Sequence, residues 1–183
     1  MTNTAMAPSH FVGISLPAEL HTVVDTIKKS VHMDDEHTLK PLIPHITLLH
    51  PSSLQHTSIE ILKQEIELVS SRVKPFTVTL DDIDFFEREV CYVRATSPQL
   101  DALQHSLVQL LPKAQQSEYN SRRFIAHVTV AQKNREPQLD TATLTKYVRS
   151  TIQLPLHFTV DSIDIFSRTA PRAYSVIERI ALR

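Results

Sequence analysis

Two histidines, His45 and His127, are the residues of this sequence best suited to chemistry. Each begins a His-x-Thr pattern between apolar residues, in the words PHITL and AHVTV. Successive side chains of a β-strand point to opposite faces, so each histidine shares a face with the threonine two places later. We therefore expect His45 with Thr47, and His127 with Thr129, to line a polar surface while the apolar neighbours enter the core.

The His-x-Thr tripeptide alone is a weak signal. With 10 histidines and 17 threonines among 183 residues, about one copy is expected by chance, and a third copy begins at His157. Spacing separates the three copies. Phe-Thr-Val begins 31 residues after His45, at Phe76, and again 31 residues after His127, at Phe158. The equal spacing pairs His45 with His127 and leaves His157 outside the pair.

Two imidazoles that face one cleft are suited to phosphodiester hydrolysis. In-line attack on phosphorus needs a base on the entering water and an acid on the departing oxygen. Histidines, with an ordinary pKa of about 6.5, can take both roles. The hydroxyls of Thr47 and Thr129 would donate hydrogen bonds to the non-bridging oxygens. We expect no metal in this scheme, and the other histidines lack the spacing of a zinc site.

The composition limits how this protein could bind phosphate and which partners its overall charge would attract. Gly13 is the only glycine, which excludes the glycine-rich loops that bind phosphate through backbone amides. Side chains must then hold any phosphate, and Lys133, after the second motif, is a further candidate. The net charge of −1 gives no general attraction to nucleic acid or membrane. Cys91 is the only cysteine, so no intramolecular disulfide can form.

No apolar run approaches the ~20 residues of a membrane span, and the N-terminus lacks the pattern of a secretory signal. We therefore expect a cytoplasmic protein that contacts no membrane. We also expect a monomer without a cofactor, whose partner is a nucleotide or the end of an RNA.

Alternating strand and helix patterns must position the two motifs. The order of these elements repeats, which favours an α+β fold built from a duplicated unit. We expect one bilobal domain over residues 1–183, with repeat halves at 10–88 and 89–183 and a loose start at 1–9. The periodicity predicts strands over 11–16, 43–49, 76–86, 90–95, 124–131, 156–166 and 174–182, and helices over 18–31, 58–69, 98–111 and 139–149.

The paired motifs resemble the two H-x-T/S signatures of the 2H phosphoesterase superfamily, which includes the 2′-5′ RNA ligase-like proteins and RNA 2′,3′-cyclic phosphodiesterases. The resemblance covers residues 11–182 in element order. It implies two antiparallel β-sheets flanked by helices around a central cleft lined by the two His-x-Thr strands. It also implies that His45 and His127 are the acid/base pair and that Thr47 and Thr129 bind phosphate.

The resemblance leaves the branch of the superfamily open. Members of the RNA-processing branch often carry an arginine shortly after the second motif, where this chain has Ala131-Gln132-Lys133. We expect a metal-independent phosphodiesterase that hydrolyses a 2′,3′-cyclic phosphate or a related 2′-linked phosphodiester, on an RNA end or a small nucleotide. The alternatives are the reverse reaction of a 2′-5′ RNA ligase, a cyclic oligonucleotide hydrolase, and a nucleotide-binding module without turnover.

Overall fold

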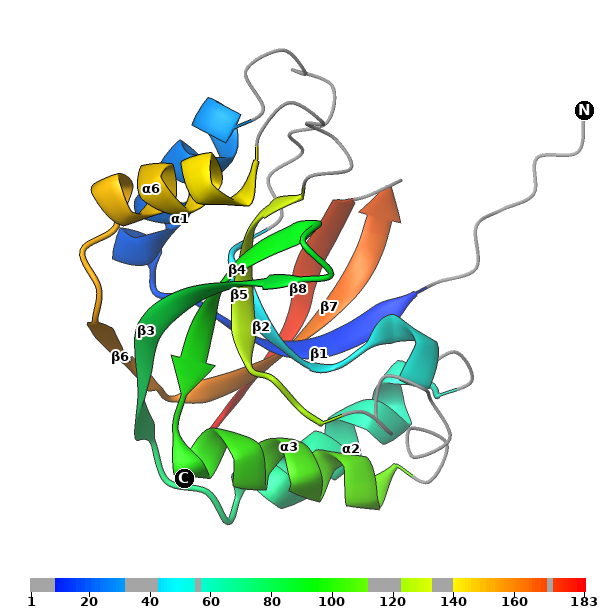
Figure 1. Cartoon of the computed structure of the whole chain (residues 1–183). Coiled ribbons are helices and arrows are strands. Elements are labelled where there is room, and N and C mark those ends of the chain that lie inside the picture. Colours follow the sequence, from blue (N-terminus) through cyan, green and yellow to red (C-terminus); the bar gives the residue numbers. More distant parts are fainter. Residues whose placement is uncertain (1–8, 32–42, 55–56, 112–122, 133–139, 171–172) are drawn as a thin grey trace, which may run out of the picture.

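The computed structural model describes residues 9–31, 43–54, 57–111, 123–132, 140–170 and 173–183. In these ranges the strands form two four-stranded antiparallel sheets (Figure 1). Sheet A has the order β2-β1-β7-β8, and sheet B has the order β5-β4-β3-β6. The strands are β1 His10–Ser15, β2 His45–Leu49, β3 Phe76–Phe86, β4 Val90–Thr96, β5 His127–Gln132, β6 Leu156–Val160, β7 Ser162–Ala170 and β8 Ala173–Ala181. The helices are α1 Ala18–Val31, α2 Ile59–Ser70, α3 Pro98–Leu110 and α6 Thr141–Thr151, with a 3-10 turn η1 at Pro51–Ser53.

This architecture confirms the predicted α+β fold of two antiparallel sheets flanked by helices, with one correction. The strand predicted over 156–166 is two strands, β6 in sheet B and β7 in sheet A. The chain passes between the sheets at Asp161, whose carbonyl oxygen accepts a hydrogen bond of 2.7 Å from the amide of Leu182. Strand-forming residues continue on both sides of this position, so the pattern of residue types does not reveal the break.

Side chains cap the first turns of α2 and α6, and the helices bury one apolar stripe each. The Ser58 hydroxyl accepts the amide hydrogen of Ile61 at 3.3 Å, and a carboxylate oxygen of Asp140 accepts that of Thr143 at 2.8 Å. Pro98 occupies the first turn of α3, where a missing amide hydrogen costs little. The buried stripes follow helical spacing: Leu62, Ile66 and Val69 in α2, Leu100, Leu103 and Leu107 in α3, and Leu144 and Val148 in α6.

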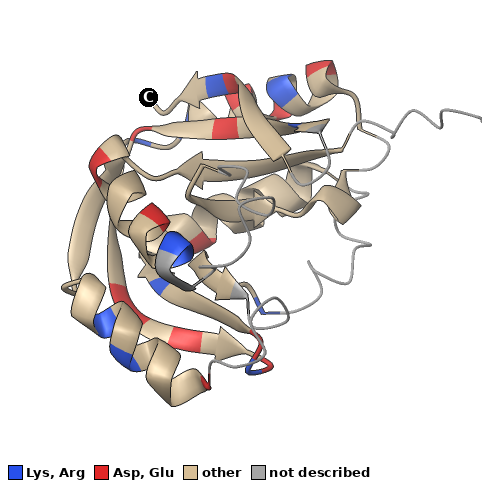
Figure 2. Ribbon diagram, turned by 90° about the horizontal axis from the view of Figure 1, so that it is seen from above, with Lys and Arg blue, Asp and Glu red and all other residues tan. Residues whose placement is uncertain are grey.

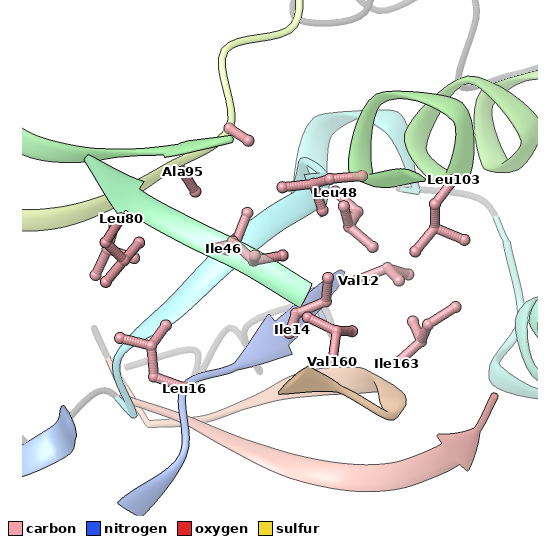
Figure 3. Packing of buried hydrophobic residues seen from close by; sticks show 14 of the residues in the cluster. Val12, Ile14, Leu16, Ile46, Leu48, Leu80, Ala95, Leu103, Val160 and Ile163 are labelled. Carbon is pink, nitrogen blue, oxygen red and sulfur yellow. The ribbon is translucent and has the colours of Figure 1, made fainter. Parts of the chain in front are cut away.

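One apolar cluster joins both sheets and the helices (Figure 3). Val12 of β1, Ile46 of β2 and Val160 of β6 are fully or almost fully buried in it. In β2 the buried Ile46 and Leu48 alternate with half-buried His45 and Thr47. Packing of one face of the strand therefore holds the opposite, polar face in place.

The two histidine strands lie next to each other although they belong to different sheets. β2 and β5 are edge strands of sheets A and B, and they contact one another. α1 packs against β5 and α3 packs against β2, so each strand is covered by a helix from the other half of the sequence. α1 lies beside α6, and α2 lies beside α3 (Figure 1). Among the described helices, none is long and apolar enough to cross a membrane.

Candidate active site

The two histidines are held in the same way. His45 and His127 each begin their strand, and each Nδ1 lies 2.7 Å from the carbonyl oxygen two residues earlier, that of Ile43 and of Ile125. A carbonyl oxygen only accepts, so Nδ1 carries the hydrogen and donates it. The lone pair of the neutral ring is then on Nε2. Within the described chain neither Nε2 has a hydrogen-bond partner, which leaves both available to a ligand.

Aromatic rings fix the His45 imidazole. Its ring centroid lies 4.7 Å from that of Phe11 and 5.2 Å from that of Phe166, and these two phenyl rings stack on each other at 4.3 Å. Gly13 lies beside this stack. A Cβ at Gly13 would be 2.6 Å from the carbonyl oxygen of Ile46 and 3.4 Å from the Phe166 ring. The absence of a side chain at this one position allows β1 and β2 to come together under His45.

The His127 imidazole has a corresponding aromatic support. Its ring makes edge contacts with Phe86 at 4.8 Å and with Tyr92 at 5.2 Å between centroids. The Tyr92 hydroxyl donates a hydrogen bond of 3.3 Å to Asp84. Burial and the neighbouring Asp84 carboxylate raise the pKa of Tyr92, so its hydroxyl keeps the hydrogen that it donates. Both histidines thus lie against apolar rings that limit their hydration.

This environment changes the proton affinity of both imidazoles. Burial lowers the pKa of His45 to about 4; the Ile43 carbonyl opposes this effect, and the charges of Lys28 and His127 add to it. Burial also lowers the pKa of His127, against the effect of the Ile125 carbonyl. Both rings are therefore neutral near pH 7 in the free protein. His45 is shifted further, so the first proton taken up as the pH falls goes to His127.

Lys28 is a residue of this site that the sequence analysis missed. It lies half-buried in the last turn of α1, the helix that packs against β5. Burial lowers the pKa of Lys28, and the charge of Asp25 opposes that effect. In the described part of the chain the Lys28 ammonium forms no hydrogen bond and no ion pair. The only sequence signal was its position four residues after the buried Val24, at the margin of the apolar stripe.

The remaining candidates fall into three groups. Thr47 and Thr129 are half-buried on the same strands, and neither hydroxyl has a hydrogen-bond partner within the described ranges. Lys133 lies outside the described residues. His157 is on β6, at the far edge of sheet B from β5, where its ring forms a hydrogen bond of 3.0 Å with the Thr79 hydroxyl. His157 is therefore remote from the pair, as its spacing indicated.

The described part of the chain holds no cluster of metal ligands. Among the described residues, no group of three or more His, Cys, Asp or Glu side chains is arranged to hold a metal ion. Cys91 is buried in β4, and burial raises the pKa of its thiol to about 12, so it is an apolar core residue.

Two antiparallel sheets whose neighbouring edge strands each begin with a tethered histidine have the architecture of the two-histidine phosphoesterases. Residues 16–172 match the family model of the 2′-5′ RNA ligase superfamily, so the chain belongs to this family of 2H phosphoesterases. The predicted family is thereby confirmed. No curated protein matches the sequence at a significant level.

Solved structures share the fold at low sequence identity. TT0787 of Thermus thermophilus is 18% identical with a TM-score of 0.71. Escherichia coli LigT complexed with 3′-AMP is 21% identical with a TM-score of 0.61. Usb1 of Kluyveromyces marxianus with uridine monophosphate is 16% identical with a TM-score of 0.50. Each alignment covers 96% of this chain and 98% of the other chain.

Proposed function

We propose that this protein is a metal-independent phosphodiesterase that opens 2′,3′-cyclic phosphates, or related 2′-linked phosphodiesters, on RNA ends or small nucleotides. The observation that carries the proposal is the matched tethering of His45 and His127. Both imidazoles present Nε2 without a hydrogen-bond partner in the described chain, on neighbouring strands, with their charges coupled. A proton donor and a proton acceptor on two sides of one phosphate is what in-line displacement requires.

In the proposed step one histidine accepts a proton and the other donates one. The neutral imidazole takes a proton from water through Nε2 while the water oxygen forms a bond to phosphorus. The bond from phosphorus to one ribose oxygen breaks, and that oxygen takes a proton from Nε2 of the other, protonated imidazole. The product is a phosphomonoester beside a free hydroxyl. Each positioned proton transfer typically contributes about 10²–10⁴ in rate.

The threonines and Lys28 supply electrostatic support in this proposal. Thr47 and Thr129 lie two residues after the histidines, with hydroxyls that have no partner in the described structure, and they donate to the non-bridging oxygens. The positive charge of Lys28 acts on His45. In this proposal it takes the place of the arginine that is often found after the second motif and that this chain lacks there. Lys133 remains a candidate for the same task.

Known complexes of similar folds support a nucleotide substrate. LigT has been solved with 3′-AMP and with phosphate, and Usb1 with uridine monophosphate. These ligands are nucleoside monophosphates or phosphate itself. A substrate with one phosphate between the two lobes also suits a protein whose net charge is only −1.

Hydrolysis of 2′,3′-cyclic AMP in the presence of EDTA tests the proposal. We expect turnover that is unchanged by the chelator, and the position of the phosphate in the product, 2′ or 3′, identifies the ribose oxygen that leaves. A screen of the other cyclic nucleotides, RNA with a cyclic-phosphate end and 2′-5′ oligoadenylates then defines the preferred substrate. Binding of all these compounds without turnover would instead make the protein a nucleotide-binding module.

A further inference from the structure

Each histidine of the pair faces one residue of the neighbouring strand. His45 is opposite Ser15 of β1, and His127 is opposite Arg94 of β4. In both sheets the next residue of β1 or β4 donates the interstrand hydrogen bond, at 2.9 Å. The facing pairs therefore lie between hydrogen-bonded pairs, where side chains approach most closely, with Cβ atoms about 4.5–5.5 Å apart. Ser15 and Arg94 thus border the histidine site.

The hydrogen of the Ser15 hydroxyl is already engaged. Asp164 of β7 accepts it, and the same carboxylate accepts the Ser15 amide hydrogen at 3.2 Å. Asp164 is 1% exposed, and the Arg179 guanidinium holds it through hydrogen bonds of 2.8 and 3.2 Å. A carboxylate only accepts and a hydroxyl has a single hydrogen, so the Ser15 oxygen has only lone pairs to offer. Towards any further group, Ser15 is an acceptor.

The Asp164 carboxylate takes the place of a missing strand partner. β1 pairs with β7 only over His10–Gly13, whereas it pairs with β2 as far as Ser15. The amide of Ser15 therefore has no partner in the ladder with β7, and a buried amide needs an acceptor. Asp164 supplies that acceptor through its side chain. The fold itself, rather than a ligand, sets the orientation of Ser15.

Ser15 lies on the face of sheet A that carries the first histidine. Phe11 shares this face with Ser15 by strand alternation, and its ring contacts the His45 imidazole. Val12 and Ile14 point to the other face and enter the core (Figure 3). Ser15 is only half-buried. Its oxygen can therefore receive a small molecule on the side of His45.

The residue that faces His127 is of the opposite kind. Arg94 has only donors, and its Nε donates to Asp81 at 2.8 Å. That hydrogen bond and the carboxylates of β3, whose acidic bands are visible in Figure 2, raise the pKa of Arg94. The Tyr92 hydroxyl near His127 also gives its hydrogen to a carboxylate, but Tyr92 is only 3% exposed. Of the two residues that face the histidines, Ser15 alone can accept.

His45 presents a second acceptor beside Ser15. Its Nδ1 donates to the carbonyl oxygen of Ile43, so the lone pair of the neutral ring is on Nε2. Burial and the charge of Lys28 keep the ring neutral near pH 7. A water molecule that donates one hydrogen to Nε2 and the other to the Ser15 oxygen has only its lone pairs left. Those lone pairs are what attack on phosphorus requires.

We propose that Ser15, oriented by Asp164, is a further catalytic residue that holds the attacking water together with His45. The inference rests on the proposed function, and it makes His45 the base and His127 the acid. The water oxygen bonds to phosphorus while one of its hydrogens passes as a proton to Nε2 of His45. The other hydrogen stays on the new phosphate oxygen, hydrogen-bonded to Ser15. The bond from phosphorus to the ribose oxygen breaks, and this oxygen takes the proton of His127. Asp164 is a positioning residue in this step.

Variants of Ser15 test its part in the reaction. Ser15→Ala removes the acceptor, Ser15→Thr keeps it, and Ser175→Ala is the control, at an exposed position of β8, the strand of sheet A farthest from β2. On 2′,3′-cyclic AMP, Ser15→Ala should lower kcat at least about tenfold, as a misplaced reactant does. Its KM should stay within about twofold, because the interaction is made with the water and not with the nucleotide. Ser15→Thr and Ser175→Ala should remain close to the wild type. A normal kcat in Ser15→Ala, or an equal loss in a folded Ser15→Thr, overturns the inference.

A second assay separates the two sides of the phosphate. Its substrate is the p-nitrophenyl ester of the product nucleotide, in a nucleoside without the neighbouring hydroxyl, so that the leaving group needs no proton. On this ester the loss in His127→Ala should largely disappear, because only the acid is dispensable. The losses in Ser15→Ala and His45→Ala should persist. Recovery of Ser15→Ala, or no recovery of His127→Ala, overturns the assignment of the water to the His45 side.

A crystal structure of the free protein tests the arrangement without turnover. We expect an ordered water within hydrogen-bond distance of both Ser15 Oγ and His45 Nε2, and its loss in Ser15→Ala. A wild-type structure without this water, or with a Ser15 hydroxyl that does not donate to Asp164, overturns the inference. Absence of hydrolysis with every substrate would overturn the proposed function instead. The ordered water then decides separately whether Ser15 and His45 share a ligand.

Discussion

His45 and His127 are coupled through their charges: after burial and the Lys28 ammonium, the charge on His127 is a cause of the lowered pKa of His45. The pair therefore has one proton over a limited pH range, between the value of about 4 for His45 and the lowered value of His127, which is below 6.5. Catalysis by one base and one acid needs that singly protonated pair.

We therefore predict a bell-shaped profile of kcat/KM with its maximum on the acidic side of pH 6.5. The profile reports the free enzyme, to which these pKa values belong. Titration of the imidazole resonances by NMR should show His127 taking up its proton before His45. A rate that is level from pH 5 to 8 would contradict two-histidine catalysis.

The same shifts make the folded state less stable in acid. A histidine whose folded pKa is below the unfolded value of about 6.5 binds fewer protons when folded, so the free energy of unfolding decreases as the pH falls from about 6.5 towards 4.

Replacing either histidine tests its part in the chemistry. We predict that His45→Ala and His127→Ala each lower kcat on 2′,3′-cyclic AMP by about 10²–10⁴, with losses in the double variant well short of additive. His157→Ala is the matched control, because it removes the histidine of the third His-x-Thr from an exposed place on β6 and should retain full activity. Circular dichroism checks the fold of each variant. A rate near that of the wild type in either single variant would remove that histidine from the mechanism.

Removing the Lys28 charge should move the proton affinity of His45 in a known direction. A nearby positive charge disfavours the imidazolium, so Lys28→Met should raise the pKa of His45. Lys29→Met, at the exposed neighbouring position, is the control. NMR titration measures both. An unchanged pKa of His45 in Lys28→Met would show that the ammonium lies too far away to support a bound phosphate.

The hydrogen bonds to the buried Asp164 carboxylate should contribute to the free energy of unfolding. Asp164 is 1% exposed, and it accepts hydrogen bonds from Ser15 and from Arg179, whose Nε lies 2.8 Å away. Arg179→Ala leaves this acceptor short of donors and should lower the free energy of unfolding by about 1–3 kcal/mol. Arg94→Ala breaks a pair of the same length, with Asp81, whose carboxylate is 27% exposed rather than buried, and should cost less than about 1 kcal/mol. Urea denaturation compares the two, and equal losses would contradict the role of burial.

Gly13→Ala should disturb the His45 strand. The added Cβ would be 2.6 Å from the backbone of Ile46, which cannot rotate away as a side chain would. We expect a loss of about 1–3 kcal/mol in stability, typical of overpacking, and a lower kcat because His45 is displaced. Thr77→Ala, at an exposed position of β3, is the control. Full stability with full activity would show that the strands separate at no cost.

Much of this fold could be predicted because its elements have strong local signals. The β3 bounds are as predicted, α2 at Ile59–Ser70 lies one residue from its predicted bounds at each end, and buried Ile46 and Leu48 leave the predicted polar face of β2. The pairing of His45 with His127 was predicted from their repeated spacing. These features depend on residues near one another in the sequence, or on a repeat that can be counted.

The rest depends on contacts between distant segments, which residue types alone do not define. The charge of Lys28 acts on His45 because α1 packs against β5, the strand beside β2. The Phe166 ring contacts His45 because β7 joins sheet A. The break at Asp161 was missed because strand-forming residues continue through it. The lowered pKa of both imidazoles follows from these same contacts, so it could not be predicted from the ordinary pKa of histidine.

Each sheet contains strands from both halves of the sequence, which has a consequence for how the two histidine strands come together. β3 comes from the first half of the sequence but lies in sheet B with strands of the second, and β7 and β8 of the second half extend sheet A from β1. Neither half of the sequence contains a complete sheet, so the sheet that carries each histidine strand needs strands from both halves. β2 and β5 therefore come to lie side by side only once strands from both halves have paired.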